Sequence, residues 1–180
     1  MAFRFIIRIV AVIAVTMSMG LSSSPQTGNI TLRSVEGDVI SLDKHRGQPV
    51  VLVFNATWVP MANKSLPALQ RIADLYSSRG VVFYWVSVNS DRVGEKRYIS
   101  DSDLKAFVKE NGLEVSALRD PEMKALRHFG LEALPSFVIL DRAGELWRLQ
   151  TGFETGQAFG YAEMAKLLDK LLRPDPLASG

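Results

Sequence analysis

The polar side chains that could carry chemistry gather around one loop. Ala56-Thr57-Trp58 directly follows the apolar run Val50–Phe54, and a helical pattern begins a few residues later. Loops that leave a buried strand and lead into a helix are where α/β folds place their sites. The polar side chains next to this loop are Asn63, Lys64 and Ser65. They lack the titratable pair that general acid–base catalysis uses, so we identify no catalytic residue here.

Cysteine is absent from the whole sequence of 180 residues. The thiolate is the nucleophile of dithiol–disulfide exchange, and no other side chain replaces it. The chain therefore has no attacking thiol, no resolving thiol and no means of forming a mixed disulfide. The same absence excludes thiol peroxidase chemistry and any zinc or iron–sulfur site built on thiolates.

The remaining candidate metal ligands are scattered along the chain. His45 and His128 fall in different expected elements and are far apart in the sequence. Met61 offers a soft sulfur ligand, but one methionine does not make a metal site, and such residues usually pack in cores. The sequence also has no Ser-His-Asp arrangement and no phosphate-binding loop. We therefore expect neither a metal nor a cofactor.

The composition is that of one ordinary globular domain. Hydrophobic residues make up 47% of the chain and charged residues 22%, and 180 residues suffice for a single domain with a core. The formal net charge is +2, and two of the basic residues, Arg4 and Arg8, fall within the first 24 residues. The remaining domain is nearly neutral. It has no bulk charge with which to attract nucleic acid, so we expect no nucleic-acid partner.

Residues 1–24 have the features of a secretory signal peptide. Arg4 and Arg8 give a positive start, Ile9–Leu21 is apolar and uncharged, and small residues follow. The uncharged run is shorter than the about 20 residues of a stable membrane span, so we predict cleavage and export to the bacterial periplasm. An uncleaved N-terminal anchor is the alternative, and membrane contact is expected only in that case. No cysteine follows the apolar run, so lipoprotein processing is excluded.

Apolar periodicity and turn signals predict the elements of the first half of the domain. They are a hairpin of residues 30–35 and 39–42, a polar turn at 43–47, strands at 50–54 and 81–88, and a helix starting near Met61 with Leu66, Leu69, Ile72, Leu75 and Tyr76 at helical spacing. The segment 90–100 contains Arg92, Lys96 and Arg97. We interpret it as a solvated loop, and a binding patch is the alternative.

The second half is expected to contain three helices and a hairpin. They are a helix from Ser100 or Asp101 to Asn111-Gly112, a short helix from Asp120-Pro121 to Gly130, a hairpin of strands 137–140 and 146–149, and an amphipathic helix at 157–172 with Phe159, Ala162, Ala165, Leu168 and Leu171 on one face. Prolines end the last helix and leave a short tail at 173–180.

Two segments resemble the TlpA/ResA-like exported thiol–disulfide oxidoreductases, which have a thioredoxin fold. Residues 56–67 read ATWVPMANKSLP, similar to the family loop ATWCPPCRxExP. Residues 130–145 read GLEALPSFVILDRAGE, similar to YGVxGxPTTFLIDRDGxI, in which the proline is cis and faces the loop. The resemblance covers residues 29–172. It implies an α/β thioredoxin-like domain whose central mixed sheet is flanked by helices, with an N-terminal hairpin and a central helix–strand insertion.

The sequence departs from the family pattern where the chemistry would be. Val59 and Ala62 stand at the positions of the two cysteines, and Met61 replaces the second proline of the motif. The glutamate that usually follows the motif falls at Ser65. The resemblance thus implies the scaffold of an oxidoreductase without its redox activity.

The expected function is capture of an extended peptide or protein partner in the cell envelope. The degenerate loop of Trp58, Val59, Pro60, Met61 and Ala62 would form one wall of a groove, and Leu134 and Pro135 the other. Pairing of an added strand with the backbone does not require cysteine. Three alternatives stay open, namely a structural subunit of an envelope complex, a non-thiol enzyme on the same scaffold, and a loop that merely closes the fold.

Overall fold

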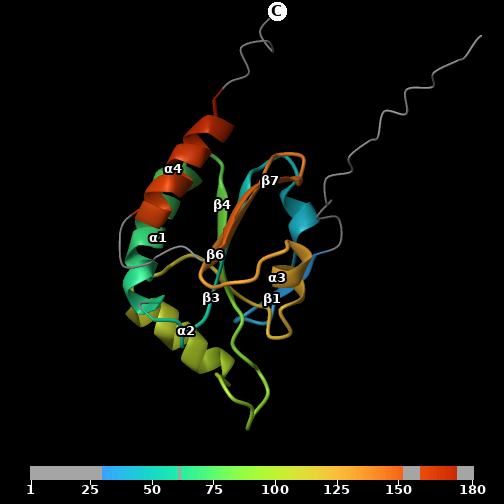
Figure 1. Ribbon diagram of the computed structural model, residues 1–180, viewed down its shortest axis with the longest axis vertical. Coiled ribbons are helices and arrows are strands. Elements are labelled where there is room, and N and C mark those ends of the chain that lie inside the picture. Colours follow the sequence, from blue (N-terminus) through green and yellow to red (C-terminus); the bar gives the residue numbers. More distant parts are fainter. Residues whose placement is uncertain (1–29, 61, 152–158, 174–180) are drawn as a thin grey trace, which may run out of the picture.

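The computed structural model describes three stretches of the chain, residues 30–60, 62–151 and 159–173 (Figure 1). The expected signal peptide at 1–24, Met61 and tail residues 174–180 lie outside the described residues. The same holds for the expected start of the last helix at Gln157. Among the described helices, none combines the length and the hydropathy that a membrane crossing requires.

A mixed sheet forms the centre of the domain, as predicted, and it has seven strands. Its order is β2-β1-β5-β4-β3-β6-β7, with β3, β4 and β5 parallel and the other neighbours antiparallel. The strands are β1 (Thr31–Ser34), β2 (Val39–Ser41), β3 (Val50–Asn55), β4 (Val82–Ser87), β5 (Ala117–Arg119), β6 (Ser136–Leu140) and β7 (Leu146–Thr151). Strand β3 is buried along its whole length because it has a neighbour on each side and helices on both faces.

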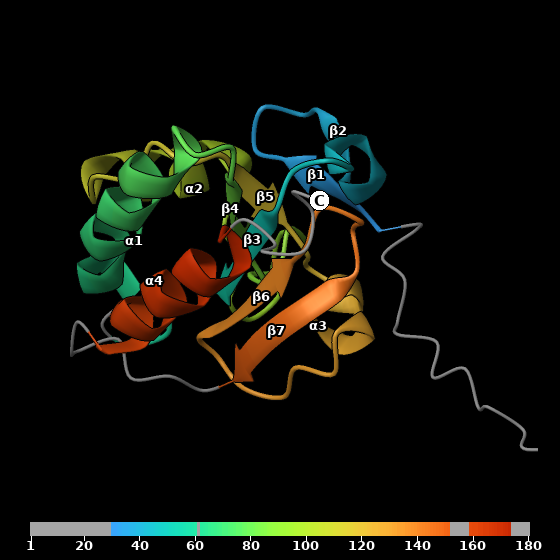
Figure 2. The same cartoon turned by 90° about the horizontal axis from the view of Figure 1, so that it is seen from above.

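Helices cover both faces of the sheet (Figure 2). The described ones are α1 (Ala62–Ser77), α2 (Asp101–Glu110), α3 (Lys124–His128), α4 (Phe159–Leu171) and the short 3₁₀ helix η1 (Leu42–His45). Helices α1, α2 and α4 pack on one face, while α3 and η1 pack on the other. The α2–β5–α3 segment is the insertion that the resemblance implied between the two halves of the fold.

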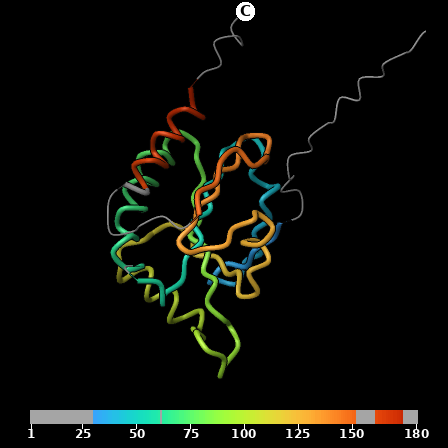
Figure 3. Tube along the Cα trace, viewed as in Figure 1, coloured from blue at the N-terminus to red at the C-terminus, as the bar shows by residue number. Residues whose placement is uncertain are grey.

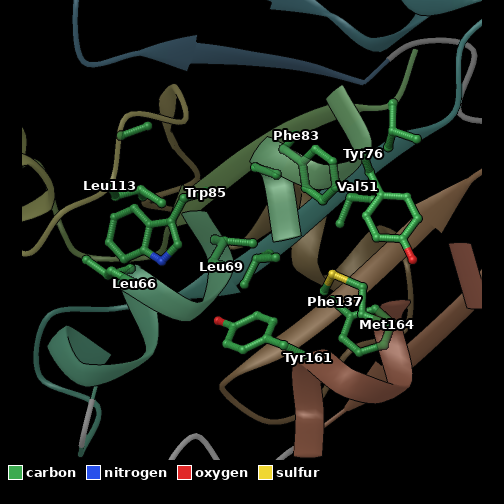
Figure 4. Packing of buried hydrophobic residues seen from close by; sticks show 14 of the residues in the cluster. Val51, Leu66, Leu69, Tyr76, Phe83, Trp85, Leu113, Phe137, Tyr161 and Met164 are labelled. Atoms are coloured by element: carbon green, nitrogen blue, oxygen red, sulfur yellow. The ribbon is translucent and has the colours of Figure 1, made fainter. Parts of the chain in front are cut away.

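Strand alternation divides the buried side chains into two cores. In the first core, sheet residues Trp85 and Phe137 meet Leu66 and Leu69 of α1 and Met164 of α4 (Figure 4). The second core gathers the opposite set of strand residues against α3 and η1; its members include Leu52, Phe54, Val86, Leu118, Leu126 and Phe129. The two cores share one sheet, so each strand is held from both sides.

Two expectations about buried helix faces are wrong. Leu75, placed on the apolar face of α1, is 64% exposed. Ala162, placed on the apolar face of α4, is exposed, and that helix buries Tyr161 and Met164 along with the expected Leu168. Both helices are apolar over a wide arc, and the packing direction chosen by the sheet decides which part of that arc is covered.

The expected polar turn at 43–47 is largely helical. Residues Leu42–His45 form η1, and Leu42 is fully covered in the second core. The buried side chain of Leu42 holds this segment against the sheet. The polar residues that follow Leu42 give no sign of that contact. The Ser100 cap of α2 is confirmed, since the Asp103 N–H donates to Ser100 Oγ over 3.1 Å.

Candidate functional site

The loop after β3 is a compact turn that leads directly into α1. The Val59 N–H donates to the Ala56 carbonyl over 3.1 Å, and the Ala62 N–H donates to the Val59 carbonyl over 3.0 Å. Trp58 is 38% exposed, whereas Val59 is 8% and Ala62 2% exposed. The turn therefore displays the indole at the surface and turns the two hydrocarbon side chains that follow it inward.

One buried amide, that of Asn89, fixes this loop. Its Oδ1 accepts from the Thr57 N–H over 3.0 Å and from Ser87 Oγ over 3.0 Å. Its Nδ2 donates to Thr57 Oγ1 over 2.9 Å and to the Arg97 carbonyl over 3.2 Å. Asn89 is 2% exposed, so these bonds are shielded from water and costly to break. The same side chain thus joins the Trp58 loop to the segment that follows β4.

That segment, residues 90–99, projects from the end of β4 beyond the sheet (Figure 3). Both ends contact buried Arg119, whose Nη2 donates to the Ile99 carbonyl over 2.9 Å and to the Ser90 carbonyl over 3.5 Å. The Nε of Arg119 lies 3.3 Å from Asp101 Oδ1. Burial lowers the pKa of the Arg119 guanidinium, and Asp101 partly offsets this. The segment is exposed, as predicted for a solvated loop, but it is anchored at its base.

Arg97 of this projecting segment covers the exposed indole. The guanidinium Cζ lies 3.7 Å from the centroid of the Trp58 ring, a cation–π contact. Arg97 takes the left-handed backbone conformation, with φ of 69°, which non-glycine residues seldom adopt. The contact therefore depends on a specific backbone shape as well as on a long side chain.

The segment before β6 forms the opposite wall of the site. The Leu134–Pro135 peptide bond is cis, as predicted. Ser136 Oγ donates to the Ala133 carbonyl over 2.5 Å and so fixes the bend that precedes the strand. Leu134 is half-buried, and within the described residues its N–H and C=O engage in no hydrogen bond.

A cavity of about 280 Å³ lies between the two walls. Its lining consists of Trp58, Val59, Pro60, Met123, Leu126, Glu132, Ala133 and Leu134. Seven of these eight residues are apolar, and among the lining residues Glu132 alone carries a charge. A cavity with this lining suits an apolar side chain of an extended segment rather than a charged small molecule.

The expected site residues divide into three groups. Trp58, Val59, Pro60 and Leu134 line the cavity. Ala62 is buried in the second core and Pro135 is also buried, and neither lines the cavity. Met61 lies outside the described residues.

Sequence reasoning missed Met123 and Leu126, which complete the cavity floor. Both come from the insertion. Asp120 organises the start of α3 by accepting from the Ala125 and Leu126 N–H groups over 3.2 Å and 2.9 Å. No local sequence pattern indicates that this short helix faces the Trp58 loop, because the two segments become neighbours only through the arrangement of the strands in the sheet.

A hydroxyl replaces the acid at the position where the resemblance places a glutamate. Ser65 is buried, and its Oγ donates to the Ala62 carbonyl over 2.6 Å. Nearby, burial raises the pKa of Tyr161 to about 12, so its phenol stays neutral at physiological pH. Neither group is poised to exchange a proton near neutrality.

The two histidines occupy unrelated places. His45 Nε2 lies 2.8 Å from the Tyr84 hydroxyl, and burial lowers the pKa of this imidazole. The ring of His128 packs edge-on against Phe129. Over the described part of the chain, no three histidine, aspartate or glutamate residues come together as a metal site.

The sequence model of the AhpC/TSA family matches residues 26–148, well over half of the chain. The chain belongs to the AhpC/TSA family. This AhpC/TSA protein is 25% identical over 150 residues to the thiol-disulfide oxidoreductase ResA of Halalkalibacterium halodurans, covering 83% of this chain and 77% of ResA. The TlpA/ResA-like resemblance carried by the two motifs is thereby confirmed.

Solved structures confirm the thioredoxin-like fold. A putative thiol:disulfide interchange protein DsbE from Chlorobium tepidum aligns with a TM-score of 0.65 at 21% identity, covering 83% of this chain and 97% of that one. A secreted Mycobacterium tuberculosis disulfide oxidoreductase, homologous to E. coli DsbE, aligns with a TM-score of 0.61 at 17% identity, covering 81% and 98%. This AhpC/TSA family member differs in holding Val59 and Ala62 where the family motif has cysteines.

Proposed function

We propose that this AhpC/TSA family member is an exported binding protein without thiol–disulfide exchange activity, and that it captures an extended segment of an envelope protein. The segment lies in the groove formed by Trp58, Val59 and Pro60 on one side and Ala133 and Leu134 on the other. One of its apolar side chains enters the cavity, and its backbone pairs with Leu134. Capture of this kind is reversible because no covalent bond forms.

The observation that carries the proposal is an apolar cavity beside an unpaired peptide group. The cavity of about 280 Å³ has room for one large aliphatic or aromatic side chain. Next to it, the Leu134 N–H and C=O have no hydrogen-bond partner within the described residues. An extended chain satisfies both features at once, through strand-like pairing and a buried anchor side chain.

The absence of redox activity follows from the side chains. A chain without cysteine has no thiolate, and the hydrocarbon groups of Val59 and Ala62 cannot attack a disulfide. A non-thiol enzyme receives no support from the site, since Glu132 is the sole titratable group among the cavity-lining residues. This lining supports capture without chemistry over catalysis.

Export is supported from two directions. The first 24 residues have the charge and hydropathy pattern of a secretory signal peptide. The Mycobacterium tuberculosis protein of the same fold is described as secreted. We place the groove's partner in the same extracytoplasmic compartment.

Filling the cavity tests this function. Ala133 is exposed and lines the cavity, so Ala133→Trp should block the anchor site without disturbing the core. Ala143→Trp is the matched control, because Ala143 is also exposed but lies in the turn between β6 and β7. When the full-length protein is screened against a random peptide library, the peptides that bind should share an apolar anchor residue.

The two tryptophan variants should then differ. Ala133→Trp should weaken binding of the selected peptides about ten-fold or more, since the anchor loses the burial of a whole side chain. Ala143→Trp should bind them like the parent protein. Equal affinity in all three proteins would show that the peptides bind outside the groove and would refute the groove model. Insulin reduction by the parent protein would refute the claim of redox inactivity.

A further inference from the structure

Within the described residues, the guanidinium N–H groups of Arg97 have no hydrogen-bond partner, and the group lies over Trp58, which lines the cavity. A Cζ-to-centroid distance of 3.7 Å is that of face contact between the guanidinium and the Trp58 ring. The donors of a guanidinium lie in its plane, so a group that rests its face on a ring directs its N–H edge outward. Within the described residues this edge has no hydrogen bond and no carboxylate partner.

The position of Arg97 is held by its backbone. The Arg97 carbonyl accepts from Asn89 Nδ2 and from the Ser90 N–H, each over 3.2 Å. Asn89 also binds both the N–H and the hydroxyl of Thr57, the residue before Trp58. One buried side chain therefore sets the register between the ring and the guanidinium that covers it. Such prior ordering lowers the entropy lost when a ligand binds.

Arg97 differs in this respect from Arg92 in the same projecting segment. Arg92 Nη1 lies 3.4 Å from Glu95 Oε1, and Arg92 Nη2 lies 3.2 Å from Glu122 Oε1. Its charge is already balanced inside the molecule. Arg97, in contrast, forms no ion pair with any of the described residues, and it lies over a residue that lines the cavity.

We propose that Arg97 determines which segments the groove accepts, by binding the side-chain carboxylate of an aspartate or glutamate that neighbours the apolar anchor. The partner is thus an extended acidic segment, with its apolar residue in the cavity and its carboxylate on the free edge of the guanidinium. A fork of two parallel N–H donors fits a carboxylate in a way that an ammonium does not. This inference rests on the proposed function, because it assigns specificity to the same groove.

The test uses an array of blocked octapeptides and the full-length protein. Each peptide is acetylated and amidated, carries a central leucine in a serine–threonine background, and has Glu, Gln or Lys at one neighbouring position. Blocking both ends ensures that a terminal carboxylate cannot substitute for the side chain. The proteins compared are the parent, Arg97→Gln, Arg97→Lys and the control Arg92→Gln, with Trp fluorescence and circular dichroism to verify folding.

The parent should bind the best glutamate peptide about five-fold more tightly than its glutamine counterpart, a gain typical of an exposed but ordered ion pair. Arg97→Gln should abolish this preference, so that it binds the glutamate and glutamine peptides equally. Arg97→Lys should retain only part of the preference, and Arg92→Gln should retain all of it.

The failures are distinguishable. If the parent binds glutamate and glutamine peptides equally, or if Arg97→Gln keeps the preference, the groove stands and the role of Arg97 is refuted. If the parent binds no peptide of the array, the groove function itself fails and this inference falls with it.

Discussion

Two hydrocarbon side chains define this protein at the scale of single residues. Val59 and Ala62 lie one helical turn apart, joined by the hydrogen bond from the Ala62 N–H to the Val59 carbonyl. This is the spacing at which the family motif holds its dithiol. Val59 is the more accessible of the two, and it reaches the cavity, whereas Ala62 is covered. Neither hydrocarbon side chain can act as a nucleophile toward a disulfide.

Restoring the cysteines tests whether the thiols alone are missing. The double variant Val59→Cys/Ala62→Cys should form a disulfide on oxidation and should reduce insulin in the presence of dithiothreitol faster than the blank. The parent protein should match the blank. The single variant Val59→Cys should form mixed disulfides without turnover, because it has no resolving thiol. A double variant that forms its disulfide, as mass spectrometry would show, yet stays inactive would indicate that the scaffold has lost more than its thiols.

At the scale of elements, the site is a meeting of three loops. The Trp58 loop ends β3, the projecting segment 90–99 ends β4, and the bend at Leu134 precedes β6. The three loops meet at one end of the strands, because β4 is the parallel neighbour of β3 and β6 is its antiparallel neighbour. Asn89 then links the first two loops, and Arg119 fixes the base of the second. The loops are exposed, but their connections are buried.

Asn89→Ala should loosen both loops together. Its loss leaves the partly buried Thr57 N–H without its acceptor, which typically costs about 1–3 kcal/mol of unfolding free energy when such a group is fully buried and less here. Hydrogen exchange should accelerate in residues 56–60 and 90–99 alike. Asn111→Ala is the control, because Asn111 Nδ2 donates to the Phe107 carbonyl within the end of α2 and joins no two elements. Faster exchange in one loop alone would show that Asn89 does not couple them.

At the scale of the whole molecule, one sheet carries two cores, and the first core sets the orientation of α1. Leu66 is fully buried there, and Leu75 of the same helix is largely exposed. At the start of this helix, the Ala62 N–H donates to the carbonyl of Val59, which lines the cavity. Stability of the first core and geometry of the site are linked through this helix.

Truncating Leu66 and Leu75 tests which side of α1 faces the first core. Leu66→Ala should lower the unfolding free energy by about 2–5 kcal/mol, the usual range for a buried leucine. Leu75→Ala should change it by less than about 0.5 kcal/mol, as expected of an exposed site. In urea titrations, far-UV circular dichroism and tryptophan fluorescence should report one shared transition, since both cores share the sheet. Separate transitions for the two probes would contradict a single cooperative unit.

The sequence by itself determined the fold class, the family and the lack of a thiol. Continuous apolar runs predict the central strands, and the two motifs, at 56–67 and 130–145, lie along the chain in the family's order. The absence of cysteine is a property of composition and needs no coordinates. Local patterns sufficed for these conclusions because the hydrophobicity of a strand and the chemistry of a side chain depend on the residues present and not on their contacts.

Tertiary structure decided the rest of the site. Met123 and Leu126 join the cavity, and Arg97 covers Trp58, through contacts between segments that are distant in sequence. The buried face of α4 followed the sheet rather than the strongest periodic pattern. These features depend on which strand ends the sheet brings together and on long side chains reaching across loops. No window of sequence contains that information, because the contacting residues become neighbours only when the sheet has formed.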